Sequence, residues 1–317
     1  MRWLTECSRA SLSEALRVVA PQLSGLPIEM RELTAKADPQ WWSSTAVLGG
    51  RFIAKFAWSR PAAQRVAHEL GVLTALTVPY RPEVVAASTD PLLFVTRRVP
   101  GSSLFDVIHS IDRDHAGRQL AEFLAALHHP ATRARVEAAV GQLPDAQSGP
   151  QHPASTSILR DRLDRWVRPD QRDTLRAWYD WLDAALAPPR PSVLAHADLH
   201  GDNQVWTGDR LRLVVDFETV SAAEPEYDFR AFPTTELLTA TMRHYRQITD
   251  HEPAVDRILA WHIRSALGDA LWRSEAGIPL PDHRTPAAWV DDLSTRFREL
   301  GVSPHNGGPT GRDRRQP

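Results

Sequence analysis

The chain contains, at residues 193–218, the stretch VLAHADLHGDNQVWTGDRLRLVVDFE. Apolar runs at 193–195 and 211–217 predict two short β-strands, and Thr207-Gly208-Asp209 predicts the turn before the second strand. Between the runs lies a polar segment, 196–203, which we expect to be a loop. The stretch therefore predicts a loop of reactive side chains held between two strands.

The order of these side chains resembles the catalytic loop of protein kinases. His196, Asp198 and Asn203 are followed, after a strand-sized gap, by Asp216 at the end of an apolar run. In kinases the first aspartate accepts the proton of the substrate hydroxyl, while the asparagine and the later aspartate bind Mg²⁺. Carboxylate and amide oxygens suit this hard cation, which neutralises the charge of a transferring phosphoryl group.

Two other interpretations fit the residue types of the segment. It could be a polar surface turn with incidental acids. It could also be a zinc site, because His196, Asp198, His200 and Asp202 alternate, but alternation brings side chains to one face only in a strand. Gly201 and the polar composition favour a loop, and with it phosphoryl transfer.

The composition limits the class of protein. At 317 residues and 42% hydrophobic content, the chain can form one large domain or two lobes around a cleft. A net charge of −2 gives no general attraction for nucleic acid or an anionic membrane. Cys7 is the single cysteine, and residues 1–23 read as neither a signal peptide nor a membrane span. We therefore expect a cytoplasmic protein, favoured as a monomer, with neither nucleic-acid nor membrane partners.

The first hundred or so residues predict a small sheet with helices. A capping box at Ser11 predicts the start of the first helix, and Gly49-Gly50 predicts a hairpin between strands at 42–48 and 52–58. Lys55, one of only two lysines, lies in the second of these strands, and Glu69 lies midway along a helix predicted to open at Ser59. Further strands are expected at 28–33, 84–85 and 92–95. Each charged side chain could also be simply solvated.

The remainder predicts a mainly helical lobe. The expected helices lie at 114–129, 158–166, 171–186, 235–248, 254–276 and 287–300. Residues 142–157, rich in Pro, Ser and Gln, predict a loop within this lobe.

Taken together, these motifs resemble the aminoglycoside phosphotransferase family of choline-kinase-like small-molecule kinases. The resemblance spans roughly residues 28–300. The residues that carry it are HADLHGDN (196–203), VVDFE (214–218), EPEYDF (224–229), AKF around Lys55 and RRVPG (97–101). It implies an α+β, bilobal, protein-kinase-like fold, with a nucleotide-binding lobe over 1–98 and a catalytic and substrate lobe over 99–302. The tail over 303–317 is rich in Gly, Pro and Arg, which predicts disorder.

The resemblance also implies roles for individual residues. Asp198 would be the catalytic base, and Asn203 and Asp216 would bind Mg²⁺. Lys55 would bind the phosphates of ATP or GTP while Glu69 holds it, and the backbone near Thr96, Arg97 and Val99 would bind the base. His196 and Asp228 would be structural. Ala197 stands where the family often has glycine, and residues 35–42 lack the glycines of a phosphate-covering loop, so the contacts to phosphate and the choice of ATP or GTP stay open.

The substrate is expected against the C-terminal helices. Acids and tryptophans in that region would suit a cationic molecule, although each could also be a solvated helix face or a core side chain. Asp269 is the first choice because such families place its helix along the cleft, and Glu218 and Trp272 are chosen with it. The wider set comprises Glu224, Glu226, Asp291, Asp292, Trp261 and Trp289.

Three functions follow. The first is transfer of the γ-phosphate of ATP or GTP to a hydroxyl of a cationic antibiotic, an aminoglycoside or a cyclic peptide, giving resistance. The second keeps the chemistry and phosphorylates an amino sugar, choline or another small metabolite. The third is a pseudokinase that binds nucleotide without turnover.

Overall fold

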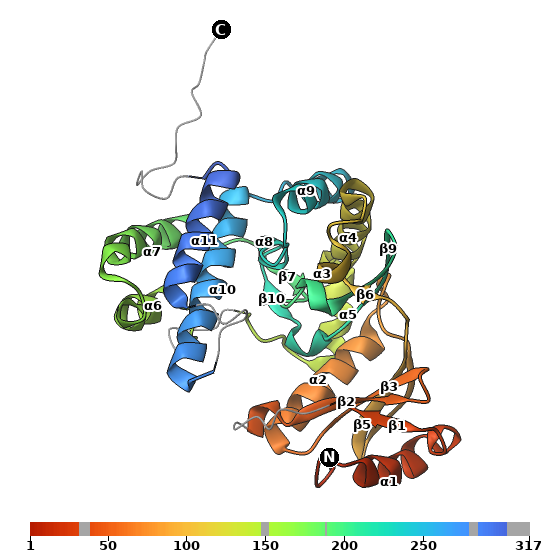
Figure 1. Cartoon of the computed structure of the whole chain (residues 1–317). Helices are drawn as coiled ribbons and strands as arrows, with labels where there is room; N and C mark the ends of the chain where they lie inside the picture. The colour runs from red at the N-terminus through yellow and green to blue at the C-terminus, as the bar shows by residue number, and fades with distance from the viewer. Residues whose placement is uncertain (32–38, 147–151, 188, 279–284, 303–317) are drawn as a thin grey trace.

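The computed structural model describes residues 1–31, 39–146, 152–187, 189–278 and 285–302. The predictions for residues 35–38 of the phosphate loop, for 147–151 of the polar loop and for the 303–317 tail lie outside the described residues. Figure 1 shows an N-terminal sheet with helices α1 and α2 on one side of the molecule and most of the helices on the other. This arrangement agrees with the predicted α+β, bilobal fold, whose division after residue 98 stays a prediction.

The N-terminal sheet is antiparallel throughout. Its strands, in the spatial order β1-β2-β3-β5-β4, are β1 (Ile28–Met30), β2 (Ser43–Leu48), β3 (Phe52–Ala57), β5 (Leu92–Arg97) and β4 (Val84–Thr89). The β2–β3 hairpin turns through Gly49 and Gly50, whose φ angles of 54° and 68° are left-handed values that glycine adopts without strain. The predicted hairpin is confirmed.

Each face of this sheet meets a helix. Helix α1 (Arg9–Val19) packs Leu12 and Leu16 against a cluster that includes Phe56 of β3. Because side chains alternate along a strand, the neighbouring Lys55 points to the opposite face, toward helix α2 (Arg60–Ala75). Ser59 caps α2, as predicted. The predicted cap at Ser11 is wrong: α1 begins at Arg9, because the Ser8 side chain accepts the Ser11 N–H.

The C-terminal lobe has two groups of helices. Helix α4 (Arg113–His128) packs along α9 (Thr235–Thr249). The second group shares its own apolar core and stands apart in Figure 1; its members are α6 (Thr156–Arg162), α7 (Arg172–Leu186), α10 (Val255–Ala276) and α11 (Pro286–Glu299). The other helices are α3 (Leu104–Val107), α5 (Pro130–Val140) and α8 (Glu226–Phe229). Among the described residues, no helix combines the length and apolarity needed to cross a membrane.

Short strands carry the central loop between these groups. Strand β7 (Val193–Ala195) pairs with β10 (Ser221–Ala223), and β8 (Gln204–Thr207) pairs with β6 (Ser102–Ser103) and β9 (Arg210–Val214). The two strands predicted around the loop are confirmed, although the second ends at Val214 rather than Phe217. Residues 196–203 are thereby anchored at both ends.

Candidate active site

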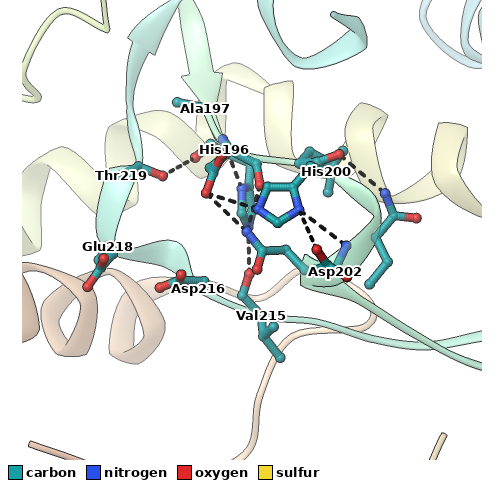
Figure 2. A network of polar contacts seen from close by, with 12 residues as sticks. His196, Ala197, His200, Asp202, Val215, Asp216, Glu218 and Thr219 are labelled. Carbon is teal, nitrogen blue, oxygen red and sulfur yellow. Dashed lines mark hydrogen bonds and ion pairs between the residues drawn. The ribbon is translucent and has the colours of Figure 1, made fainter. Parts of the chain in front are cut away.

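The loop begins at a buried histidine. The His196 ring lies 3.0 Å from the Val215 carbonyl through Nε2, and its Nδ1 accepts the N–H of Asp198 at 3.3 Å. Burial lowers the pKa of His196, so the ring is neutral with its proton on Nε2. Thr219 donates its hydroxyl to the His196 carbonyl, a bond drawn in Figure 2. The structure thus gives His196 a bracing position, with no ring nitrogen left for proton transfer.

Asp228, fully buried, holds the backbone of the same loop. Its carboxylate accepts the N–H groups of His196 and Ala197, both at 2.8 Å, and lies 3.0 Å from His128. Burial alone would raise the pKa of Asp228, but the hydrogen bonds and charge of its neighbours hold that pKa below its usual value. These bonds support the unusual φ of 66° at Ala197, a left-handed conformation that costs a non-glycine residue about 1 kcal/mol.

We expect Asp228→Asn to destabilise the fold. The amide presents a donor where two backbone donors need acceptors, and burying an unsatisfied pair costs about 3 kcal/mol. Urea unfolding monitored by tryptophan fluorescence would measure the loss. Asp180→Asn is the control, because this exposed carboxylate pairs with Arg160 at the surface and its loss should cost about 0.5 kcal/mol of stability. Equal stability of the two variants would contradict the role given to Asp228.

Asp198 and Asn203 lie together at the loop. The Asn203 amide donates to the Asp198 carbonyl at 2.8 Å and to the Asp198 carboxylate at 3.2 Å. Burial would raise the pKa of Asp198, but a hydrogen bond from His200 and the charges of His200 and Arg230 hold it below its ordinary value. Asp198 is therefore ionised at neutral pH and able to accept a proton. His200, for which the sequence predicted no catalytic role, lies 3.5 Å from this carboxylate.

Lys55 lies among three carboxylates. Its ammonium is 2.6 Å from Glu69, 2.8 Å from Asp216 and 3.2 Å from Glu218. These acids raise the pKa of Lys55 well above its ordinary value despite the burial of the amine. The predicted Lys55–Glu69 pair is present, and Asp216 is brought to the same point from a segment 161 residues away.

Helix α2 is joined to the turn η6 (Phe217–Thr219) at several points. Glu69 accepts the Phe217 N–H at 3.2 Å, His68 lies 3.0 Å from the Val220 carbonyl, and Arg65 binds Glu218. Figure 2 shows Asp216 and Glu218 on the α2 side of the site, away from His200 and Asp202. Arg65 and His68 were not predicted from the sequence, although Arg65 precedes His68 by three residues and Glu69 by four, the spacings that bring helix side chains together.

The expected base-binding segment begins at the end of β5. Thr96 pairs with Ile53 within the sheet, and Arg97 donates its N–H to Glu83 and forms an ion pair with it at 2.7 Å. Val99 lies just beyond the strand, and within the described ranges its backbone groups make no backbone hydrogen bond. Of the predicted residues, Val99 therefore has the backbone most open to a ligand.

The predicted substrate acids do not form one pocket. Glu218 lies with Lys55 and Arg65, not beside Asp269 and Trp272, which project from α10. Trp272 is 37% exposed, and Asp269 is paired with Arg273 at 2.8 Å. Three of the other acids are also matched by arginines: Glu224 by Arg257, Glu226 by Arg190, and Asp291 by Arg168. The expectation of an accumulated negative charge is therefore wrong for these five acids.

The residues present fit a bound Mg²⁺ ion. Because the Asn203 amide nitrogen donates to Asp198, its oxygen is turned away and accepts no hydrogen bond from the described residues. Its backbone carbonyl accepts the Val215 N–H at 2.9 Å, which keeps it next to Asp216. Oxygens of Glu69, Asp216 and Glu218 lie within 4.8 Å of one another, but Lys55 already contacts all three. Asn203 and Asp216 form the better donor set.

Solved structures with the same fold include three kinds of small-molecule kinase. The GDP complex of aminoglycoside 2'-phosphotransferase-IIIa has a TM-score of 0.67 at 16% identity, covering 92% of this chain and 98% of that one. A choline/ethanolamine kinase family protein from Mesorhizobium loti has a TM-score of 0.62 at 18% identity, covering 93% and 95%. Macrolide 2'-phosphotransferase type I has a TM-score of 0.61 at 19% identity, covering 96% and 99%.

These likenesses confirm the bilobal, kinase-like fold. No curated protein sequence matches the chain. The family model described as Phosphotransferase enzyme family (APH) matches residues 29–278, which is most of the chain. The resemblance inferred from the motifs is thereby confirmed: the chain belongs to the phosphotransferase enzyme family.

Proposed function

We propose that the protein transfers the γ-phosphoryl group of ATP or GTP to a hydroxyl of a small molecule. The observation that carries this proposal is the ionised Asp198, held by Asn203 and His200 on a loop that Asp228 and His196 brace. In the reaction the acceptor oxygen forms a bond to the γ-phosphorus and the bond to the β-phosphate oxygen breaks. The hydroxyl proton passes to Asp198, and ADP or GDP leaves.

Asn203 and Asp216 would hold Mg²⁺ in this proposal. When bound, the ion would neutralise charge on the phosphates of the nucleotide. Lys55 would bind phosphate oxygens, with Glu69 as its fixed partner, and the segment near Thr96, Arg97 and Val99 would bind the base. The division into a nucleotide lobe, 1–98, and a substrate lobe, 99–302, belongs to the same proposal.

The pH dependence tests the role of Glu69. Burial raises the pKa of Glu69 to about 7, an effect that the Lys55 ammonium offsets only in part. As the pH falls through this value Glu69 takes up a proton, and Lys55 loses the charge that orients it. We expect kcat/KM for the nucleotide to fall on the acid side of neutrality. Glu69→Gln should lower kcat/KM at pH 8 and abolish this acid limb; an unchanged pH profile in Glu69→Gln would refute the assignment.

The acceptor is the open part of the proposal. The fold neighbours include complexes of streptomycin, kanamycin and gentamicin with aminoglycoside phosphotransferases, which supports an antibiotic acceptor and a role in resistance. The choline/ethanolamine kinase neighbour supports a small metabolite instead. Because arginines pair with five of the acids expected to bind a polycation, we rank the aminoglycoside and cyclic-peptide classes below less charged hydroxyl compounds.

One assay tests these alternatives. ADP and GDP release would be followed with Mg²⁺ and ATP or GTP, against aminoglycosides, cyclic peptides, macrolides, amino sugars and choline. Turnover on an antibiotic supports the first function, and turnover only on an amino sugar or choline supports the second. Nucleotide binding without turnover on any acceptor would favour a pseudokinase. Omission of Mg²⁺ should abolish activity in either enzymatic case.

A further inference from the structure

Arg264 of helix α10 differs from Arg257 and Arg273, the other two arginines of that helix. Its Nε donates to the Ala154 carbonyl at 2.5 Å, and its guanidinium lies 5.3 Å from the centre of the Trp261 ring. Neither terminal nitrogen has a hydrogen-bond or ion-pair partner among the residues that the structure describes. Arg257 and Arg273 on the same helix each hold a carboxylate. Arg264 is thus a cation without a matched anion.

The surroundings of Arg264 make this arrangement costly. Burial lowers the pKa of its guanidinium, and Tyr227, Asp183 and Asp145 offset this only from beyond ion-pair distance. Asp183 is already bound to Arg160. His152 lies two residues before Ala154 in the chain, and its pKa is lowered by burial and by the charge of Arg264. A partly dehydrated cation beside another basic group would gain most from an anionic ligand.

The residues of α10 on either side of Arg264 in the sequence, Trp261 and Ser265, are connected to the catalytic loop. Trp261 meets the Tyr227 ring edge-on, with centroids 5.3 Å apart, and both rings share a cluster with Ala197. Arg230 then bridges α10 to the loop, donating to Ser265 at 3.1 Å and to the Ala197 carbonyl at 2.5 Å. The Arg230 side chain therefore connects Ser265, the residue after Arg264, to Ala197, the residue before Asp198.

We infer that Arg264 is a specificity-determining residue that binds a carboxylate or phosphate group of the acceptor, next to the indole of Trp261. The two terminal nitrogens can donate to both oxygens of such a group while Nε stays on Ala154. A polycation would be repelled at the same place. The inference rests on the proposed phosphoryl transfer and gives its acceptor a chemical class, an alcohol that bears an oxyanion.

Four probes with one scaffold test the inference: glycerate, glycerol phosphate, glycerol and 3-amino-1,2-propanediol. Binding of each to protein saturated with ADP and Mg²⁺ would be measured by calorimetry, and turnover by nucleotide release. In Arg264→Gln we expect affinity for an anionic probe to fall about 10- to 100-fold, as loss of a charge-assisted hydrogen bond predicts. The KM of an anionic acceptor should rise by the same factor with kcat little changed. Glycerate and glycerol phosphate distinguish a carboxylate from a phosphate.

Two further variants keep the test specific. Arg264→Lys retains the charge and should recover part of the affinity, whereas Arg246→Gln removes a surface cation that pairs with Glu252 and should change nothing. Unchanged binding of both anionic probes in Arg264→Gln, or tighter binding of the amine, would overturn the inference. Anion binding that needs Arg264 but comes with no turnover on any acceptor would contradict the proposed reaction alone. Equal turnover of neutral or amine acceptors by the wild type and Arg264→Gln, without turnover of the anionic acceptors, would contradict the inference but not the proposed reaction.

Discussion

Asp198→Asn should lower kcat by about 10³-fold while leaving nucleotide affinity nearly unchanged. The amide has the shape of the carboxylate but cannot accept the proton of the attacking hydroxyl. The lowered pKa of Asp198 means that the base is already ionised at neutral pH, so the variant removes a group in its active form. Steady-state kinetics with the best acceptor, and titration of a fluorescent nucleotide, would measure the two quantities separately.

The matched control for this prediction is Asp202→Asn. Asp202 lies on the same loop, but its side chain is 66% exposed. Its carboxylate comes no nearer than 3.9 Å to the His200 ring, so this ion pair is weak. Its loss changes the local charge equally and should change kcat by less than about threefold. Comparable losses in the two variants would show that the charge of the loop, rather than a base at Asp198, supports the reaction.

Asp216→Asn should abolish the Mg²⁺ dependence of nucleotide binding and lower kcat/KM by about 10³-fold or more. Asparagine is the informative replacement because Asp216 has a φ of 67°, a left-handed conformation that asparagine adopts more readily than alanine. The amide would be a weaker magnesium ligand and would also leave Lys55 with one carboxylate fewer. A Mg²⁺ titration of nucleotide affinity, in wild type and variant, would measure the effect.

Asp250→Asn controls for the backbone at this position. Asp250 ends helix α9 and has a φ of 57°, so the same substitution is made in the same backbone conformation. We expect its Mg²⁺ titration to match the wild type. A titration that remained unaltered in Asp216→Asn as well would remove Asp216 from the metal site and leave the neighbouring acids as candidates.

Local signals in the sequence predicted the parts of this site that are formed by residues close together in the chain, namely the loop and the hairpin. The order His196, Asp198, Asn203 and Asp216 marked a loop between strands, and Gly49-Gly50 marked the hairpin that carries Lys55. Both signals lie within short, continuous segments of the chain, where the residue types themselves favour a turn or a loop. The exception, the cap at Ser11, was off by one helical turn because Ser8 carried the same signal.

Pairing between distant segments was decided only by the tertiary structure. Lys55 meets Asp216 and Glu218, Arg257 neutralises Glu224, Arg168 reaches Asp291, and Arg264 is left without a carboxylate. Residue types and periodicity alone do not say which arginine faces which acid, because that depends on how helices far apart in the chain pack together. The sequence by itself therefore determined the fold, the family and the reacting loop. The charge of the acceptor site depended on long-range packing, since an acid attracts a cationic substrate only where no protein cation has already neutralised it.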